Sequence, residues 1–263
     1  MKIFSNFLLM ITLLVPILSL AQVSADSLKS DTGMSAEYKS EHRSQFKIRM
    51  SPFAAIASSA GIAYGFVKLG NHGLSDLDIA ARHEFALEHP HRKFRVDDYL
   101  QFAPGALVLG LSAAGLKGRN RTIDQAGIYL LSNIILTVSC QSLKRITKVP
   151  RPDGSSNAFP SGHTAEAFAS AEFLSQEYGA RSLAYPISGY AAAVATAYYR
   201  MYNNKHWLSD VVAGAGIGFL STRASYWLYP KIKKLLSANE NGRSVLLPSY
   251  GHNAVGAAMI CYF

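Results

Sequence analysis

The chain of 263 residues is long enough for one domain, and its 49% of apolar residues lies at the upper end of ordinary globular usage. A net charge of +9 suits an anionic substrate, an anionic membrane surface, or basic residues that flank membrane segments, and we expect no nucleic-acid partner. Two cysteines exclude a disulfide framework, and a mean hydropathy of +0.10 is low for a chain that crosses a membrane many times.

The N-terminus has the pattern of a secretory signal peptide. Lys2 precedes an apolar run from Phe7 to Leu20, and small residues suited to cleavage follow at Ala21 and Ala25. We therefore expect residues 1–25 to be a signal peptide or an N-terminal anchor. The polar stretch 26–49 is expected to be flexible.

Apolar segments recur along residues 50–236 and predict an all-α domain. The segments are Met50 to Leu69, Tyr99 to Leu116, Ala126 to Leu143, Thr164 to Tyr178, Ser182 to Tyr199 and Trp207 to Tyr229. Several reach the length of about 20 residues that crosses a bilayer. We expect a membrane-embedded bundle of about six apolar helices with the active site at one end. In the tail, 237–263, the last ten residues, Ala254 to Phe263, predict one short strand.

Two histidines stand in clusters of residues suited to phosphate chemistry. His206 and Asp210 are four residues apart, so on a helix the carboxylate can accept the Nδ1 proton of the imidazole. Nε2 then keeps a free lone pair, which makes it a competent nucleophile toward phosphorus. His163 remains as a second imidazole that can protonate the leaving oxygen of a phosphate ester near neutral pH.

Basic residues supply the rest of a phosphoryl-transfer site. Lys144, Arg151 and Arg200 can stabilise charge on the phosphate oxygens without a metal, so we expect neither a metal nor a cofactor. Ser161 is suited to cap the helix that follows it, and the free amides near Gly162 would point at an anion. These residues are the predicted phosphate contacts.

Three further histidines, His83, His89 and His91, lie in a charged stretch with irregular spacing. Paired histidine ligands of structural zinc sites are commonly separated by about three to five residues. We interpret these three as solvated loop histidines that hold no metal.

In this order and spacing, the motifs resemble the three-part signature of the type 2 phosphatidic acid phosphatase superfamily. The parts are Lys144 with six residues before Arg151-Pro152, then Pro160-Ser161-Gly162-His163, then Arg200 with five residues before His206 and three more before Asp210. The resemblance covers about Leu100 to Tyr229. It implies that His163 is the general acid, that His206 is the nucleophile that becomes phosphorylated, and that Asp210 orients it. Tyr199 departs from the pattern, which usually has Ser before the third-motif Arg, and this affects a minor phosphate contact.

The order of motifs and apolar segments places both histidine clusters on one face. The opposite face receives the basic stretches 117–121 and 231–234, and is cytoplasmic by the positive-inside rule. We therefore expect the site to face the periplasm from a bacterial inner membrane; a soluble periplasmic or outer-membrane-associated protein is the alternative. This topology can arise in two ways. Either Met50 to Leu69 lies along the membrane or packs on the bundle, or the first hydrophobic run remains as an anchor. We favour the former.

The expected reaction is metal-independent hydrolysis of a phosphate monoester or diphosphate of a membrane lipid through a phosphohistidine. The runs Asp97 to Pro104 and Arg200 to Trp207 resemble lipid A phosphatases of Gram-negative bacteria. Undecaprenyl diphosphate and phosphatidylglycerol phosphate are alternative substrates. The expected partners are thus a phosphorylated lipid and the membrane, and the sequence leaves the oligomeric state open.

Three other functions use the same residues. A soluble periplasmic acid phosphatase, similar to the bacterial class A enzymes, is supported by the low hydropathy. A vanadium-dependent haloperoxidase would hold vanadate in the phosphate pocket, but that family tends to have longer chains. A pocket that binds lipid phosphate without turnover would not need both histidines together with Asp210.

Overall fold

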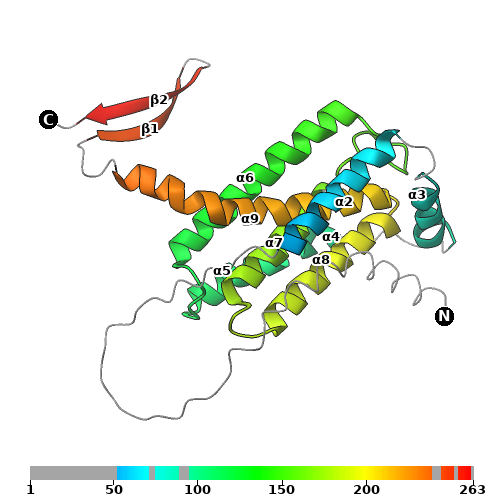
Figure 1. Cartoon of the computed structure of the whole chain (residues 1–263), viewed down its shortest axis with the longest axis horizontal. Coiled ribbons are helices and arrows are strands. Elements are labelled where there is room, and N and C mark those ends of the chain that lie inside the picture. The colour runs from blue at the N-terminus through cyan, green and yellow to red at the C-terminus, as the bar shows by residue number, and fades with distance from the viewer. Residues whose placement is uncertain (1–51, 71–74, 89–94, 239–243, 252–253, 262–263) are drawn as a thin grey trace, which may run out of the picture.

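The computed structural model describes residues 52–70, 75–88, 95–238, 244–251 and 254–261, which form a bundle of helices followed by a hairpin (Figure 1). The expected signal peptide, 1–25, and the polar segment, 26–49, lie outside the described residues. So do His89 and His91.

The described elements follow in chain order. They are α2 (Pro52–Gly70), α3 (Ser75–Arg82), the π-helix η4 (His83–Leu87), α4 (Asp97–Leu100), α5 (Ala103–Ala113), α6 (Thr122–Thr147), α7 (Gly162–Tyr178), α8 (Ala184–Tyr202), α9 (Leu208–Ala238), β1 (Ser244–Gly251) and β2 (Ala254–Cys261). The six apolar segments correspond to α2 and α5 to α9, so the predicted helices of the bundle are confirmed. The apolar pattern did not predict α3, η4 and α4, because these helices are short and carry polar residues.

Two local expectations differ from the structure. His83 is not in a loop: it begins η4, where its exposed imidazole lies 3.3 Å from Glu88. The tail holds two antiparallel strands rather than one, with Ser244 paired to Cys261. Pro248 inside β1 hid that strand from a reading of the sequence, because proline is rare within regular strands.

The central element is α7, which packs against α5, α6, α8 and α9. Nearly all of its side chains from Thr164 to Tyr178 are buried, including three glutamates. Each glutamate has a partner within the bundle, because a buried carboxylate without one would be costly. The contacts are Tyr129 to Glu166 at 2.6 Å, Arg223 to Glu172 at 2.5 Å, and Asn120 to Glu177 at 2.6 Å.

One described helix, α6, is long and apolar enough to cross a bilayer, whereas the sequence predicted several. For α7, the difference arises because this helix lies inside the bundle and carries charged side chains that pair with its neighbours. On α6, Leu130, Ile134 and Val138 follow one another at intervals of four residues and are all more than half exposed. An outward apolar face therefore runs along this helix.

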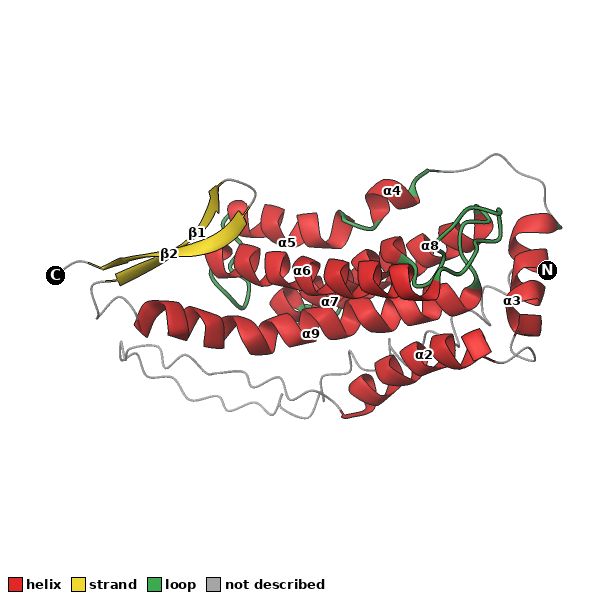
Figure 2. Cartoon of the chain, turned by 90° about the horizontal axis from the view of Figure 1, so that it is seen from above, coloured by secondary structure: helices red, strands yellow, loops and turns green. Residues whose placement is uncertain are grey.

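The helix ends define where a site can form. The chain leaves α6 and enters α7 through residues 148–161, and leaves α8 and enters α9 through residues 203–207. Figure 2 shows the loops gathered at the end of the bundle beside α3. All three motifs lie at these helix ends, as the sequence predicted. Helix α2 packs against α9 along the bundle. Its place relative to the membrane stays a prediction.

Close approach of α7 and α9 depends on Gly218, where an added Cβ would overlap the carbonyl oxygen of Ala165. We predict that Gly218→Ala lowers the free energy of unfolding by about 1–3 kcal/mol, the usual cost of overpacking a core. Gly110→Ala is the matched control, because a Cβ there meets nothing within 4 Å and alanine favours the helix. Thermal unfolding followed by circular dichroism measures both, and equal midpoints for the two variants would contradict the prediction.

Candidate active site

His206 and Asp210 form a buried pair at the start of α9. His206 precedes the helix and Asp210 lies in its first turn, so a separation of four residues brings Nδ1 to 3.3 Å from the carboxylate Oδ2. The same oxygen accepts the backbone N–H of Trp207 at 2.9 Å. With Nδ1 donating to Asp210, Nε2 is the nitrogen that keeps a lone pair.

Ser161 joins the second motif to the third. Its backbone N–H donates to the carbonyl oxygen of Asp210 at 3.0 Å. Its buried hydroxyl caps α7 by accepting the N–H of Thr164 at 3.4 Å. The predicted capping role of the hydroxyl is thus seen in the structure, while its phosphate contact stays a prediction. The backbone amide of Gly162, which has no acceptor among the described residues, stays a predicted contact.

The three predicted cations come from three different segments. Lys144, in the last turn of α6, donates to the carbonyl oxygens of Asn157 and Ala158 at 2.9 and 3.3 Å. Arg151 lies in the following loop, and Arg200 near the end of α8. The Nε atoms of both arginines are buried without an acceptor among the described residues, so each retains a donor for an oxyanion.

These cations act on His206 through the low-dielectric interior. Burial lowers the pKa of His206, and Arg200, Lys144 and Arg151 lower it further. Burial and the neighbouring Arg200 also lower the pKa of Arg151. The site therefore favours the unprotonated form of His206, the predicted nucleophile, while it concentrates positive charge that a phosphate would neutralise.

His163 lies in the first turn of α7, with Nε2 at 3.1 Å from Oδ1 of Asp98. Burial and Arg200 lower the pKa of His163, whereas Asp98 and Asp97 raise it. His163 also contributes to the field that lowers the pKa of His206. The two histidines predicted to share the reaction thus face the same site.

Sequence reasoning missed the roles of Asp97 and Asp98, although it noted the run that contains them. Both lie on α4, and Asp97 accepts a hydrogen bond from Arg200 Nη1 at 2.6 Å and one from Asn203 at 3.4 Å. The available signal was a pair of adjacent carboxylates directly before an apolar segment. Nothing in the spacing indicated which motif either carboxylate would reach.

Oxygen and nitrogen atoms of Asp97, Asp98 and His163 lie within 4.8 Å of one another, which could suit a cation. However, Asp97 is committed to Arg200, and Asp98 to His163 and Arg95. A guanidinium already balances the charge of this cluster. We interpret it as an ion-pair network, and the absence of a metal from the reaction stays a prediction.

Helices α2 and α3 hold the third motif from outside. Asp78 of α3 accepts both the backbone N–H and the hydroxyl of Ser209, at 2.9 and 2.7 Å, and pairs with Lys68 of α2 at 2.7 Å. Trp207 is fixed by a hydrogen bond from its indole N–H to the carbonyl oxygen of Pro150, at 2.9 Å. The loop that carries His206 is therefore anchored on two sides.

Tyr199, the departure from the expected signature, is part of an aromatic cluster. Its ring contacts those of Tyr198 and Tyr202 edge-on, with centroids 5.7 and 6.3 Å apart. Aromatic pairs of this geometry stabilise a helix end by packing. The position thus contributes to the end of α8, directly before Arg200.

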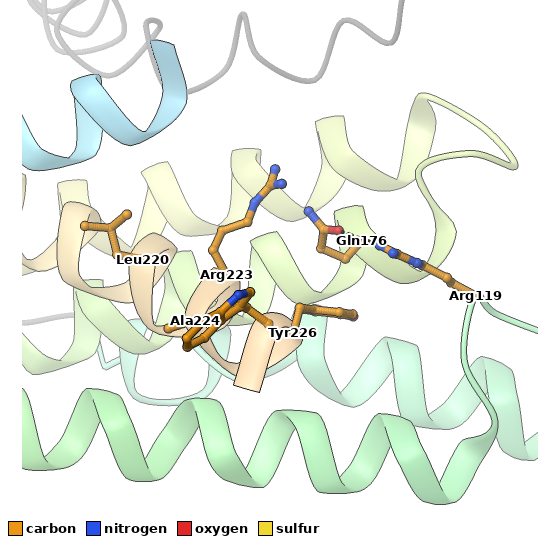
Figure 3. A pocket seen from close by; sticks show the side chains of 7 residues that line it. Arg119, Gln176, Leu220, Arg223, Ala224 and Tyr226 are labelled. Carbon is orange, nitrogen blue, oxygen red and sulfur yellow. Dashed lines mark hydrogen bonds between the residues drawn. The ribbon is translucent and has the colours of Figure 1, made fainter. Parts of the chain in front are cut away.

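A separate pocket lies between α7 and α9, away from the motifs (Figure 3). It is lined by Arg119, Gln176, Leu220, Arg223, Ala224, Tyr226 and Trp227. Arg223 is paired with Glu172, so its charge is balanced inside the bundle. None of the predicted site residues lines this pocket, and we do not assign it a phosphate.

Residues 125–234, which include every motif residue from Lys144 to Asp210, match the PAP2 superfamily. The chain carries a PAP2 superfamily domain. The resemblance inferred from the three motifs is thereby confirmed. The domain spans α6 to α9 and leaves α2 to α5 and the terminal hairpin outside the match.

A curated relative of the PAP2 domain, the lipid A 1-phosphatase of Porphyromonas gingivalis, is 37% identical over 141 residues. The match covers 51% of this chain and 31% of that relative, so the chain spans about a third of the relative's length.

Two solved structures are similar to the chain. A transmembrane PAP2-type phosphatidylglycerolphosphate phosphatase from Bacillus subtilis has a TM-score of 0.51 and 20% identity, over 68% of this chain and 98% of that one. This likeness shows the shared fold. LpxE of Aquifex aeolicus has a TM-score of 0.45 and 23% identity, over 57% of this chain and 94% of that one.

We predict that orthovanadate, a phosphate analogue, binds the purified protein. Arg151→Ala should weaken binding by roughly 10-fold or more, because a charge-assisted contact to the oxyanion is lost. Arg145→Ala is the control, since Arg145 is exposed on the last turn of α6 and belongs to no motif. Isothermal titration calorimetry measures the dissociation constants. Equal vanadate affinities for the two variants would show that Arg151 does not contact the anion.

Proposed function

We propose that the protein is a phosphatase that removes phosphate from a membrane lipid through a phosphohistidine on His206, with lipid A as the substrate. The observation that carries the proposal is the buried His206–Asp210 pair, which faces three cations and a second histidine. The similarity to a lipid A 1-phosphatase supports the choice of lipid. The proposed phosphate contacts are Lys144, Arg151, Arg200, Ser161 and the amide of Gly162.

The proposed reaction has two steps. Nε2 of His206 attacks phosphorus, the bond from phosphorus to the ester oxygen breaks, and protonated His163 donates its proton to that oxygen. Asp210 stabilises the positive charge that develops on His206. In the second step, neutral His163 takes a proton from water, whose oxygen attacks phosphorus as the bond from phosphorus to Nε2 of His206 breaks. Inorganic phosphate leaves and both histidines return to their starting states.

The membrane location rests on α6 and on charge. The outward apolar stripe of Leu130, Ile134 and Val138 suits contact with lipid chains. Lys144, at the C-terminal end of α6, marks the site end of that helix, and the basic stretch 117–121 precedes its other end. By the positive-inside rule, this arrangement supports a site on the periplasmic face of the inner membrane.

A soluble periplasmic acid phosphatase is the second candidate function. Two observations favour it: the mean hydropathy of +0.10, and the finding that only α6 among the described helices meets the requirements for a membrane span. The two candidates share their chemistry and differ in the substrate's apolar part.

We predict that the purified protein releases phosphate from lipid A in detergent with a chelator present, and that His206→Ala lowers kcat by roughly 10³-fold or more, because the nucleophile is removed. His83→Ala is the matched control, since His83 is exposed on η4 and lies outside the motifs. Malachite-green detection measures the phosphate. Undiminished release by His206→Ala would contradict the nucleophile assignment, and loss of wild-type release on adding the chelator would contradict metal independence.

We predict that the full chain expressed in a Gram-negative host partitions into the detergent phase of Triton X-114, because the exposed face of α6 is apolar. Replacing Leu130 and Val138 by Lys is expected to reduce this partitioning, since each charge opposes transfer of that face into lipid. Immunoblots of the two phases measure the distribution. Full recovery of the wild type in the periplasmic soluble fraction would favour the acid phosphatase.

A further inference from the structure

Helix α4 places two adjacent carboxylates against two different motifs of the active site. Asp97 is 1% exposed and pairs with Arg200, while Asp98 is 31% exposed and lies 3.1 Å from Nε2 of His163. Neither carboxylate belongs to the matched PAP2 region, which begins at residue 125. A segment outside the domain match therefore reaches into the site.

We propose that Asp98 is a positioning residue. It orients the imidazole of His163 and stabilises the protonated form, which donates a proton to the leaving group. The proposal rests on the proposed phosphatase function. In the protonated imidazole, Nε2–H donates to Asp98, and Nδ1–H is the proton transferred to the ester oxygen as the phosphorus–oxygen bond breaks. The imidazole that remains is neutral, keeps its hydrogen bond to Asp98, and recovers a proton on Nδ1 from the attacking water.

The geometry fixes Asp98 before substrate arrives. Its Oδ2 accepts a hydrogen bond from Arg95 Nε at 3.0 Å, and its backbone carbonyl accepts one from the buried side chain of Gln101 at 2.8 Å. Oδ1 is thereby left to His163. A carboxylate held at both the side chain and the backbone can set the orientation of an imidazole, as in other histidine–carboxylate pairs.

The charges around His163 explain why such a residue is needed. Arg200, from α8, and burial both disfavour the protonated imidazole, and His206 faces it from the loop before α9. On α4, Asp97 also raises the pKa of His163, but its own ion pair is with Arg200. Asp98 favours the charged form through a direct hydrogen bond to the imidazole, and its other partner, Arg95, is 87% exposed, so that water screens the charge of that guanidinium.

Two substrates separate this role from a purely structural one. An alkyl phosphate monoester has a poor leaving group and depends on protonation, whereas the nitrophenolate of 4-nitrophenyl phosphate leaves with little assistance. Asp98→Asn keeps the shape of the side chain and removes its charge. We expect it to lower kcat/KM for the alkyl ester by roughly 10–100-fold, part of the usual contribution of a general acid, and by less than about 3-fold for the nitrophenyl ester.

The pH dependence gives a second readout with a definite sign. Removing the carboxylate destabilises the protonated imidazole, so the pKa of His163 falls. The alkaline limb of kcat/KM should therefore move to lower pH in Asp98→Asn, and Asp98→Glu should restore it in part. Asp124→Asn is the matched control: Asp124 is also an aspartate in an ion pair, with Lys233, but lies at the opposite end of α6.

Nuclear magnetic resonance titration of the His163 ring tests the pairing without turnover. We expect a lower pKa for His163 in Asp98→Asn than in the wild type and in Asp124→Asn, in variants whose thermal unfolding and vanadate binding are unchanged. Suppose that the wild type hydrolyses both esters. If Asp98→Asn then has the same ratio of kcat/KM for the two esters, the same alkaline limb of the pH profile and the same pKa of His163, the role of Asp98 is refuted. If the wild type hydrolyses neither ester, the phosphatase proposal fails instead, and the titration still decides the pairing.

Discussion

The burial of an ionisable pair, His206 and Asp210, is the constraint on which the rest of the site depends. A carboxylate and an imidazole with side chains no more than 2% exposed are stable only if their partners are fixed around them. Here the partners come from several segments: Trp207 donates its amide, Ser161 binds the Asp210 backbone, and the three cations approach from α6, α8 and the intervening loop. The fold around this end must therefore be rigid.

Antiparallel packing of α6 to α9 supplies that rigidity. Two helices end and two begin at the same end of the bundle, so residues distant in sequence converge without long loops. Small residues allow the backbones to approach, since Cβ atoms at Gly214 and Gly218 would overlap or crowd the backbone of Ser161 and Ala165. The close spacing of α7 and α9 and the placement of the second motif against the third are thus one structural feature.

The sequence predicted the bundle and its motifs better than their surroundings, for physical reasons. Apolar periodicity identifies helices such as α6, and the separation of His206 and Asp210 by one helical turn predicts their contact directly. Pairings between distant segments leave no such local signal. The contacts of Asp98 with His163, over 65 residues, and of Asp78 with Ser209, over 131, depend on tertiary packing. The sequence also predicts that the hydroxyl of Ser161 caps α7, because a serine directly before a helix is a local signal.

The short helices between α2 and α5 contribute to the site in a different way from the helices of the bundle. The proposed phosphate contacts lie on α6 to α8 and in the loop between α6 and α7, within the matched domain, and the group that they would bind is common to all phosphate esters. By contrast, α3 and α4 contribute Asp78, Asp97 and Asp98 to the support of the site, and they also expose Leu77, Ile79 and Tyr99. Exposed apolar side chains suit contact with a substrate that is itself part apolar. Under the proposed function, we therefore expect these elements, rather than the three motifs, to distinguish lipid phosphates from soluble esters, because the phosphate group is common to both.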